Sequence, residues 1–265
     1  MSGISTKGKS VSTTIGIKEL LDAGVHFGHQ TKRWNPKMKP FIFDARNGIH
    51  IIDLSKTATQ LQAACHFLSE TVRKGQSVLF VGTKKQAQLA VKETAKECGQ
   101  MFVTERWLVG TLTNYTTLKR SIARLKEIEK METDGSINAY VKQEQSMIRR
   151  EAARFFKYLD GIRTMDKMPG AMFIVDLKRE HNAVAEARKL KIPVVALVDT
   201  NADPDQADFP IAGNDDAIRS VRVILAAIGQ AVTQGKAEFE AKKSRKAQAE
   251  ETAEAPAEVA APVAA

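Results

Sequence analysis

The chain has 265 residues, of which 43% are apolar, and its net charge at pH 7 is +9. This apolar content is enough for a packed core and excludes an intrinsically disordered protein. No apolar run approaches the roughly 18 residues of a membrane-spanning helix, and the first residues contain no apolar signal segment, so we expect a soluble protein that is not secreted.

The first predicted elements are a β-hairpin and two helices around a buried strand. The segments "PFIF" and "GIHIIDL" are joined through Asn47-Gly48, a pair typical of a tight β-turn. Apolar residues share one face of a helix predicted over residues 55–75. The run "SVLFVG" (Ser77–Gly82) predicts a strand that is buried on both faces. The next helix is expected to begin after Thr83, as its N-cap, and to end at Gly99.

Residues 114–165 show a different pattern. One apolar stripe covers residues 114–132, "TDGS" interrupts it, and apolar residues then recur in a seven-residue repeat from Val141 to Ile162. The stripes are narrow and the other faces are charged, which predicts an antiparallel coiled-coil hairpin that projects as an arm. The hairpin's charged faces fit either a nucleic-acid contact or a solvated surface.

The second half returns to alternating strands and helices. Strands are predicted at "GAMFIVDL" and "IPVVALVD", with the helix "KREHNAVAEARKLK" between them, an edge strand at Asp208–Ile211 and a long helix that ends near Gly235. This alternation predicts an α/β domain with a parallel sheet covered by helices on both faces. We assign residues 15–113 and 166–235 to this domain, 114–165 to the hairpin insertion and 1–14 to a flexible N-terminus.

Residues 236–265 form a C-terminal tail, which begins as a mixed-charge helical stretch. From about residue 247 the tail has low complexity and is expected to be disordered, because it has too few apolar residues to bury. Residues 247–265 contain four of the 31 acidic residues and no basic residue, so the remainder carries 40 basic and 27 acidic residues, a net charge of +13. Such an excess favours polyanionic partners through counterion release and electrostatic steering.

Basic residues gather in two places. One is the loop around Trp34, between Ala23 and Phe43, which Pro36 and Pro40 stiffen. The other is the edge of the parallel sheet, where two basic pairs follow two different strands and should converge. Basic groups neutralise phosphates, and an indole can pack on a sugar or base. The candidate RNA-binding residues are therefore Lys32, Arg33, Trp34, Lys37, Lys39, Lys84, Lys85, Lys178 and Arg179.

Enzyme signals are weak by comparison. The turn "GTKK" (82–85) joins a strand to a helix, as phosphate-binding loops do, but it matches neither G-x-G-x-x-G nor G-x-x-x-x-G-K-[ST], and the sequence has no G-x-S-x-G. The two cysteines of the chain form no zinc or disulfide framework, which fits a reducing compartment. We expect no catalysis and no cofactor; a nucleotide- or metal-dependent α/β enzyme is the alternative.

A divalent-cation site is a separate hypothesis, because acidic residues crowd the segment "DTNADPDQAD" at the edge of the sheet. Oxygen ligands alone would suit magnesium, and an added histidine would favour zinc. The alternative, which we favour, is that these acids cap turns around Pro204 and Pro210. The candidate ligands are Asp199, Asp203, Asp205, His26 and His29.

Four stretches, "IKELLDAGVHFGHQTKRWNPKMKPFIF", "NGIHIIDLSKT", "VLFVGTKKQA" and "PGAMFIVDLKREHNAVAEARKLKIPVVALVDTNADP", together resemble the bacterial form of the ribosomal small-subunit protein S-two family. The resemblance runs from about Ile15 to Gly235. It implies a Rossmann-like (flavodoxin-like) three-layer domain interrupted by a coiled-coil hairpin. It also implies a non-catalytic protein of the cytoplasmic ribosome that binds 16S ribosomal RNA between head and body. Its expected partners are neighbouring small-subunit proteins, including the RNA-binding protein S-one, which it helps to recruit.

Overall fold

The body of the protein is built on one parallel sheet. The computed structural model describes residues 15–253, with side chains for 15–245, so the predicted flexible N-terminus and the last residues of the tail lie outside the described residues. In spatial order the strands are β5 (Met101–Val103), β4 (Val78–Val81), β6 (Ala171–Val175), β7 (Val194–Val198) and β8 (Phe209–Ala212). Four of these five strands, β4 to β7, are buried at every residue.

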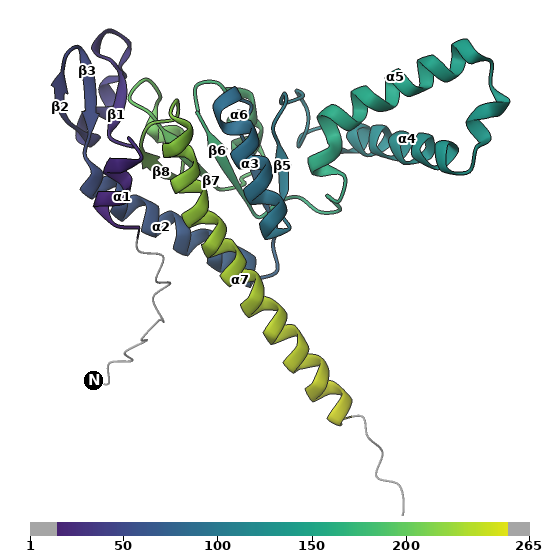
Figure 1. The fold of residues 1–265 in the computed structure, drawn as a ribbon. Helices are drawn as coiled ribbons and strands as arrows, with labels where there is room; N and C mark the ends of the chain where they lie inside the picture. Colours follow the sequence, from purple (N-terminus) through teal and green to yellow (C-terminus); the bar gives the residue numbers. More distant parts are fainter. Residues whose placement is uncertain (1–14, 254–265) are drawn as a thin grey trace, which may run out of the picture.

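This strand order confirms the predicted flavodoxin-like topology, in which the chain reverses its direction of winding between β4 and β6. One face of the sheet is covered by α2 (Leu54–Arg73), α3 (Lys85–Cys98) and α7 (Ile218–Ala253), with α1 (Ile17–Asp22) beside α2. The other face packs against α6 (His181–Lys189) and the base of the helical hairpin. The three layers are therefore as expected (Figure 1).

A small antiparallel sheet stands at one end of the body, in the order β1 (Phe27–Gln30), β3 (Ile49–Ile52) and β2 (Ile42–Arg46). The turn between β2 and β3 is confirmed, because Asn47 and Gly48 have φ of +51° and +75°. Strand β1 was not predicted, since its sequence "FGHQ" has no apolar alternation. The remaining short elements are the 3₁₀ turns Thr31–Arg33, Pro36–Phe41, Ser136–Ala139, Asp160–Ile162 and Pro204–Gln206.

The predicted hairpin is formed by α4 (Tyr115–Thr133) and α5 (Lys142–Leu159), which extend away from the body (Figure 1). Its base, however, belongs to the body. Leu118 and Ile122 of α4, with Leu159 and Ile162 at the end of α5, share one apolar cluster with Leu79 and other residues of the sheet. Only the distal part of the hairpin is thus an arm, so the projecting segment is shorter than the predicted range 114–165.

Two predicted helix ends differ from the structure. Helix α3 begins at Lys85, and Thr83 does not cap it, because the Thr83 side chain bonds Glu180 instead. Helix α7 continues from Ile218 to Ala253, well past Gly235 and into the low-complexity stretch. Within the described residues, no helix is both long and apolar enough to span a membrane.

Candidate nucleic-acid interface and a buried acid cluster

The carboxyl edge of the sheet between β4 and β6 is where doubly wound enzymes usually bind ligands. Here that position is filled by the protein's own side chains. The Thr83 main-chain N–H donates to Glu180 Oε1 at 3.1 Å, and the Thr83 hydroxyl also bonds that carboxylate. Arg179 Nε donates to Thr83 Oγ1 at 3.0 Å. The two basic segments after β4 and β6 therefore do converge, and hydrogen bonds from Thr83 and Arg179 join them.

Lys84 is a correction to the predicted RNA-binding set. Its side chain turns inward, and Nζ lies 2.7 Å from Asp215, 2.6 Å from Asp216 and 3.6 Å from Asp176. Burial alone would lower the pKa of Lys84, but these carboxylates outweigh it and raise the pKa above its ordinary value. Lys84 is only 8% exposed, so it neutralises internal acids and is not available to an external phosphate. Lys85, Lys178 and Arg179 remain exposed at the same edge.

The loop around Trp34 is anchored to the turn between β7 and β8. The Asn35 N–H donates to the Thr200 carbonyl at 2.7 Å. Lys37 Nζ lies 2.8 Å from both Asp203 and Asp205, so this cation already has acidic partners. Trp34 is partly exposed, and its ring centroid lies 5.3 Å from that of His50.

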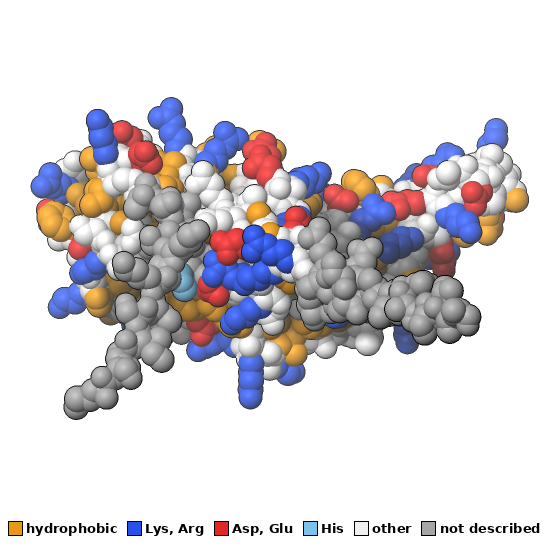
Figure 2. Space-filling view, turned by 90° about the horizontal axis from the view of Figure 1, so that it is seen from below, with side chains coloured by type: hydrophobic (Ala, Val, Ile, Leu, Met, Phe, Trp, Pro, Cys, Tyr) orange, Lys and Arg blue, Asp and Glu red, His pale blue; other side chains and the backbone are white. Residues whose placement is uncertain are grey.

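The anchored loop leaves three cations for a partner. Lys32, Arg33 and Lys39 are exposed, and among the described residues they take part in no ion pair. They are held on a segment whose backbone is fixed, which suits contact with a structured polyanion. On the face drawn in Figure 2, by contrast, Lys and Arg side chains are dispersed among Asp and Glu side chains.

The predicted metal ligands do not all meet. Asp203 and Asp205 are paired with Lys37. His26 packs against Phe27, with ring centroids 4.0 Å apart, and burial lowers its pKa. Of the predicted set, only His29 and Asp199 come together, with His29 Nδ1 2.9 Å from Asp199 Oδ2.

A third acid, Asp215, completes this group and was missed from the sequence. One ligand atom each from His29, Asp199 and Asp215 lies within 4.8 Å of the others. Asp215 follows β8, as Asp199 follows β7, and the shared sheet edge is the signal that could have revealed it. Thr200, whose N–H donates to Asp199 Oδ1 at 2.5 Å, holds that carboxylate in place.

The electrostatics of this cluster are unbalanced. Asp215 is fully buried, and burial, followed by the charges of Asp199 and Asp176, raises the pKa of its carboxyl to about 7. Its Oδ2 atom has no hydrogen-bond partner among the described residues. A hydrogen bond to Asp199 raises the pKa of His29. The group thus brings together one imidazole and two carboxylates, the donor types of a small-cation site, beside the Lys84 ammonium.

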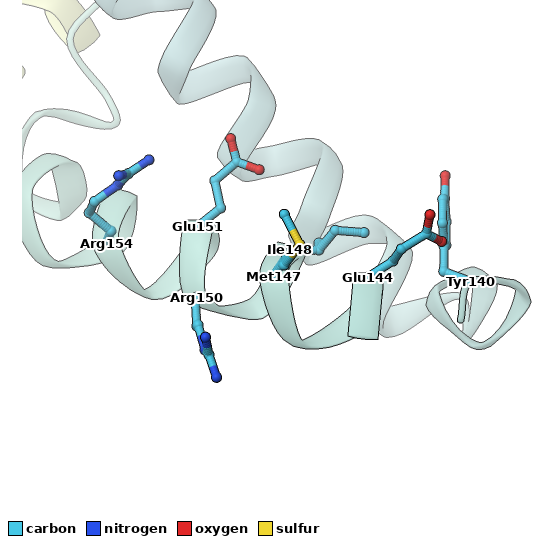
Figure 3. A pocket seen from close by; sticks show the side chains of 7 residues that line it. All are labelled: Tyr140, Glu144, Met147, Ile148, Arg150, Glu151 and Arg154. Atoms are coloured by element: carbon cyan, nitrogen blue, oxygen red, sulfur yellow. The ribbon is translucent and has the colours of Figure 1, made fainter. Parts of the chain in front are cut away.

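A separate hollow of about 690 Å³ lies along α5 of the hairpin (Figure 3). Its apolar part includes Met147, which is 64% exposed, and Tyr140 near the tip. Glu144, Glu151 and Arg154 border it, while Arg150 points away from the other labelled side chains. The mixture of acidic and basic groups makes this face less suited to phosphate than the Trp34 loop.

The family model for ribosomal protein S2 matches residues 20–235. This range begins in α1 and includes the whole sheet, the hairpin and most of the packed part of α7. The family consists of structural ribosomal proteins and not of enzymes. The chain therefore belongs to the ribosomal protein S2 family and is a structural component of the small ribosomal subunit.

Proposed function

We propose that this protein binds 16S ribosomal RNA between the head and body of the small subunit through its anchored basic loop. The observation that carries the proposal is the exposure of Lys32, Arg33 and Lys39 without internal acidic partners among the described residues. Trp34 beside them offers a partly exposed aromatic surface. Lys85, Lys178 and Arg179 are further exposed cations, at the edge of the parallel sheet.

The physical basis is electrostatic. Each phosphate that a cation neutralises releases counterions and steepens the fall of affinity with salt. A loop held by the Asn35–Thr200 hydrogen bond and by Lys37 loses little conformational entropy on binding. Lys37 therefore acts as an anchor of the loop, and the three unpaired cations act as the phosphate ligands.

The test is the salt dependence of binding to small subunits that lack this protein. The triple variant Lys32→Ala/Arg33→Ala/Lys39→Ala should flatten the slope of log affinity against log salt by about 2 to 3, which corresponds to about 0.7–0.9 per lost phosphate contact. The matched control is Lys242→Ala/Lys243→Ala/Arg245→Ala, which removes the same charge from exposed positions on α7. Equal slopes for the two variants would exclude the loop from the interface.

A second part of the proposal is that the protein helps to recruit the RNA-binding protein S-one. The support is the family itself, as the resemblance of the four quoted stretches indicates. Small subunits lacking this protein should retain less S-one after sedimentation, and adding back the purified chain should restore it. Full retention of S-one without the chain would refute this role.

We propose further that His29, Asp199 and Asp215 bind a divalent cation with a structural role. The supporting observation is the buried, unpartnered Oδ2 of Asp215 beside two other ligand groups. One imidazole nitrogen with two carboxylates suits zinc better than magnesium, which prefers oxygen ligands and retains waters. The bound ion would share with Lys84 the compensation of the buried acids.

Metal analysis after dialysis tests this site. The wild type should retain close to one equivalent, and Asp215→Asn should retain less than a tenth of that. Asp205→Asn is the control, since this exposed acid pairs with Lys37 outside the cluster. A wild type with less than a tenth of an equivalent, or equal amounts in all three proteins, would rule out the metal.

A further inference from the structure

Glu186 of α6 is a buried carboxylate with an unusual set of partners. It is 8% exposed and belongs to none of the ion pairs between described residues. Instead it accepts five hydrogen bonds from the loop that leads from β5 into the hairpin. Oε1 accepts from Trp107 Nε1 at 3.0 Å and Gly110 N at 2.7 Å, and Oε2 accepts from Leu112 N at 3.0 Å, Thr113 N at 3.0 Å and Thr113 Oγ1 at 3.2 Å.

The charge on Glu186 is stabilised by these donors. Burial alone would raise the pKa of its carboxyl, but the bonds from Trp107 and the three main-chain N–H groups outweigh burial and lower it. An ionised acceptor makes stronger hydrogen bonds than a neutral one, and more so in a buried site. Three of the donors are main-chain groups, so the carboxylate fixes the path of the backbone itself.

The returning end of the hairpin is fixed by a different contact. Gly161 follows α5 and passes so close to the edge strand that a Cβ built on it would lie 2.0 Å from the Phe102 carbonyl oxygen. Leu159 and Ile162 on either side belong to the core of the body. The return segment is therefore seated on the body, and the direction of the hairpin depends on the outgoing side, which consists of the loop before α4 and the basal residues Leu118 and Ile122 that pack on the same core.

We infer that Glu186 is a positioning residue, whose carboxylate sets the angle at which the hairpin leaves the body. The outgoing loop ends at Asn114, and α4 begins at Tyr115, two residues after Thr113. A rotation of the hairpin about its seated return segment requires this loop to move. Such a movement would break the hydrogen bonds that three of its main-chain N–H groups donate to this one buried anion. Glu186 thus converts a hinge into a rigid connection.

The experiment measures the hairpin angle in the full chain. Nitroxide labels at Ser136→Cys on the hairpin tip and Gln62→Cys on α2 occupy exposed positions, whereas Cys65 and Cys98 are 2% exposed and should not react. Pulsed electron–electron double resonance should give one narrow distribution of the distance between the two labels in the wild type. Glu186→Gln, which places an NH₂ group against N–H donors, should broaden it at least twofold. It should also speed hydrogen exchange at Gly110, Leu112 and Thr113 at least tenfold.

The matched control is Glu105→Gln. Glu105 is an exposed carboxylate in the same loop, and it lies 3.7 Å from Lys157 of α5. This variant should keep the wild-type distances and exchange rates. Trp107→Phe, which removes a single donor, should give a smaller broadening and serves if Glu186→Gln does not fold. Wild-type distributions and exchange rates in Glu186→Gln, or in Trp107→Phe if only that variant folds, would overturn the inference.

A binding measurement separates this inference from the proposed function, on which its last step rests. If the hairpin docks at a fixed angle, Glu186→Gln should associate several-fold more slowly with small subunits that lack the protein. Broad distances with an unchanged association rate would uphold the positioning role and refute the use of that angle in docking. The salt slope of the anchored loop would be unaffected in either case.

Discussion

The α/β body and the helical hairpin bury their apolar side chains in different ways. In the body, all residues of β4, β6 and β7 are buried, because helices cover both faces of the sheet. In the hairpin, α5 has 18 residues, of which only Leu159 is buried. Helix α4 buries a single stripe, which consists of Leu118, Ile122, Leu125 and Ile128. The body is thus a cooperative core, and the distal hairpin is one seam whose order depends on its base.

The largest expected effect is the loss of the fold when the whole hairpin, including its base, is replaced by a linker. Replacing residues 114–165 with a short linker removes five residues from the apolar cluster that the hairpin base shares with the sheet, namely Leu118, Ile122, Leu159, Ile162 and Met165. Each large buried apolar residue contributes about 2–5 kcal/mol, and total stabilities are about 5–15 kcal/mol. We therefore expect this variant to lose its fold, although the sequence pattern alone predicts that the whole of 114–165 projects as an arm.

Shortening the hairpin instead, by replacing residues 126–150, keeps the basal residues and should leave the melting temperature of the body within a few degrees. Circular dichroism and NMR dispersion of the two variants test the boundary. If the longer excision also gives a well-dispersed spectrum, the base of the hairpin does not contribute to the core.

A second prediction compares one buried residue from each region. Phe173 lies in β6 and Ile128 in α4, and both are 0% exposed. Phe173→Ala should lower the free energy of unfolding by about 3–5 kcal/mol. Ile128→Ala should act locally, because Ile128 belongs to neither apolar cluster of the body. Hydrogen exchange should quicken along α4 and α5, while denaturant unfolding of the body shifts little. Equal shifts in both variants would mean that the hairpin unfolds together with the body.

The comparison also explains what the sequence could reveal. Long apolar runs identified β4, β6 and β7, because a strand buried on both faces has no polar alternation. The hairpin followed from its seven-residue repeat. Strand β5 was missed, since Met101–Val103 is only three residues long and acquires its partner from β4. The anchoring of the hairpin base was also missed, because a stripe that faces another helix looks the same as one that faces a sheet.

For the candidate site, the sequence could predict which segments meet but not where their side chains point. Topology brings the ends of parallel strands together, so the meeting of the segments around Lys84 and Arg179 could be expected. The direction of a side chain could not, and Lys84 points inward because buried Asp215 stands opposite it. The five donors to Glu186 had no sequence signal either, since three of them are main-chain N–H groups.

A third prediction sets two buried glutamates against each other. Hydrogen bonds lower the pKa of Glu186 in the folded state, despite burial, so its stabilisation is present above the pKa of about 4.3 of the unfolded chain and is lost as pH falls. Burial raises the pKa of Glu180 at the sheet edge, so its contribution is complete below that value and is lost as pH rises through the folded pKa.

Denaturant titrations between pH 3 and 7 check the two signs. Relative to wild type, Glu186→Gln should lose stability less steeply on acidification. Glu180→Gln should lose it more steeply, because the opposing contribution is gone. Parallel pH profiles for the wild type and both variants would contradict the pKa directions.

The smallest effect is expected at the far end of α7, which extends from the body as the hairpin does (Figure 1). Up to Phe239 this helix still contacts the end of α2 and the turn that follows it. Glu238 lies 2.5 Å from Arg73, and a Cβ on Gly75 would lie 2.7 Å from the Phe239 ring. Truncation after Gly235 should therefore cost about 1–3 kcal/mol from the apolar area of Phe239, or several degrees in melting temperature. Truncation after Lys246 removes a segment without apolar periodicity and should leave the melting temperature unchanged within error. Calorimetry of the two truncated proteins shows how far along α7 the helix contributes to the stability of the body. A clear drop in melting temperature on truncation after Lys246 would show that residues beyond its last contact with α2 also contribute.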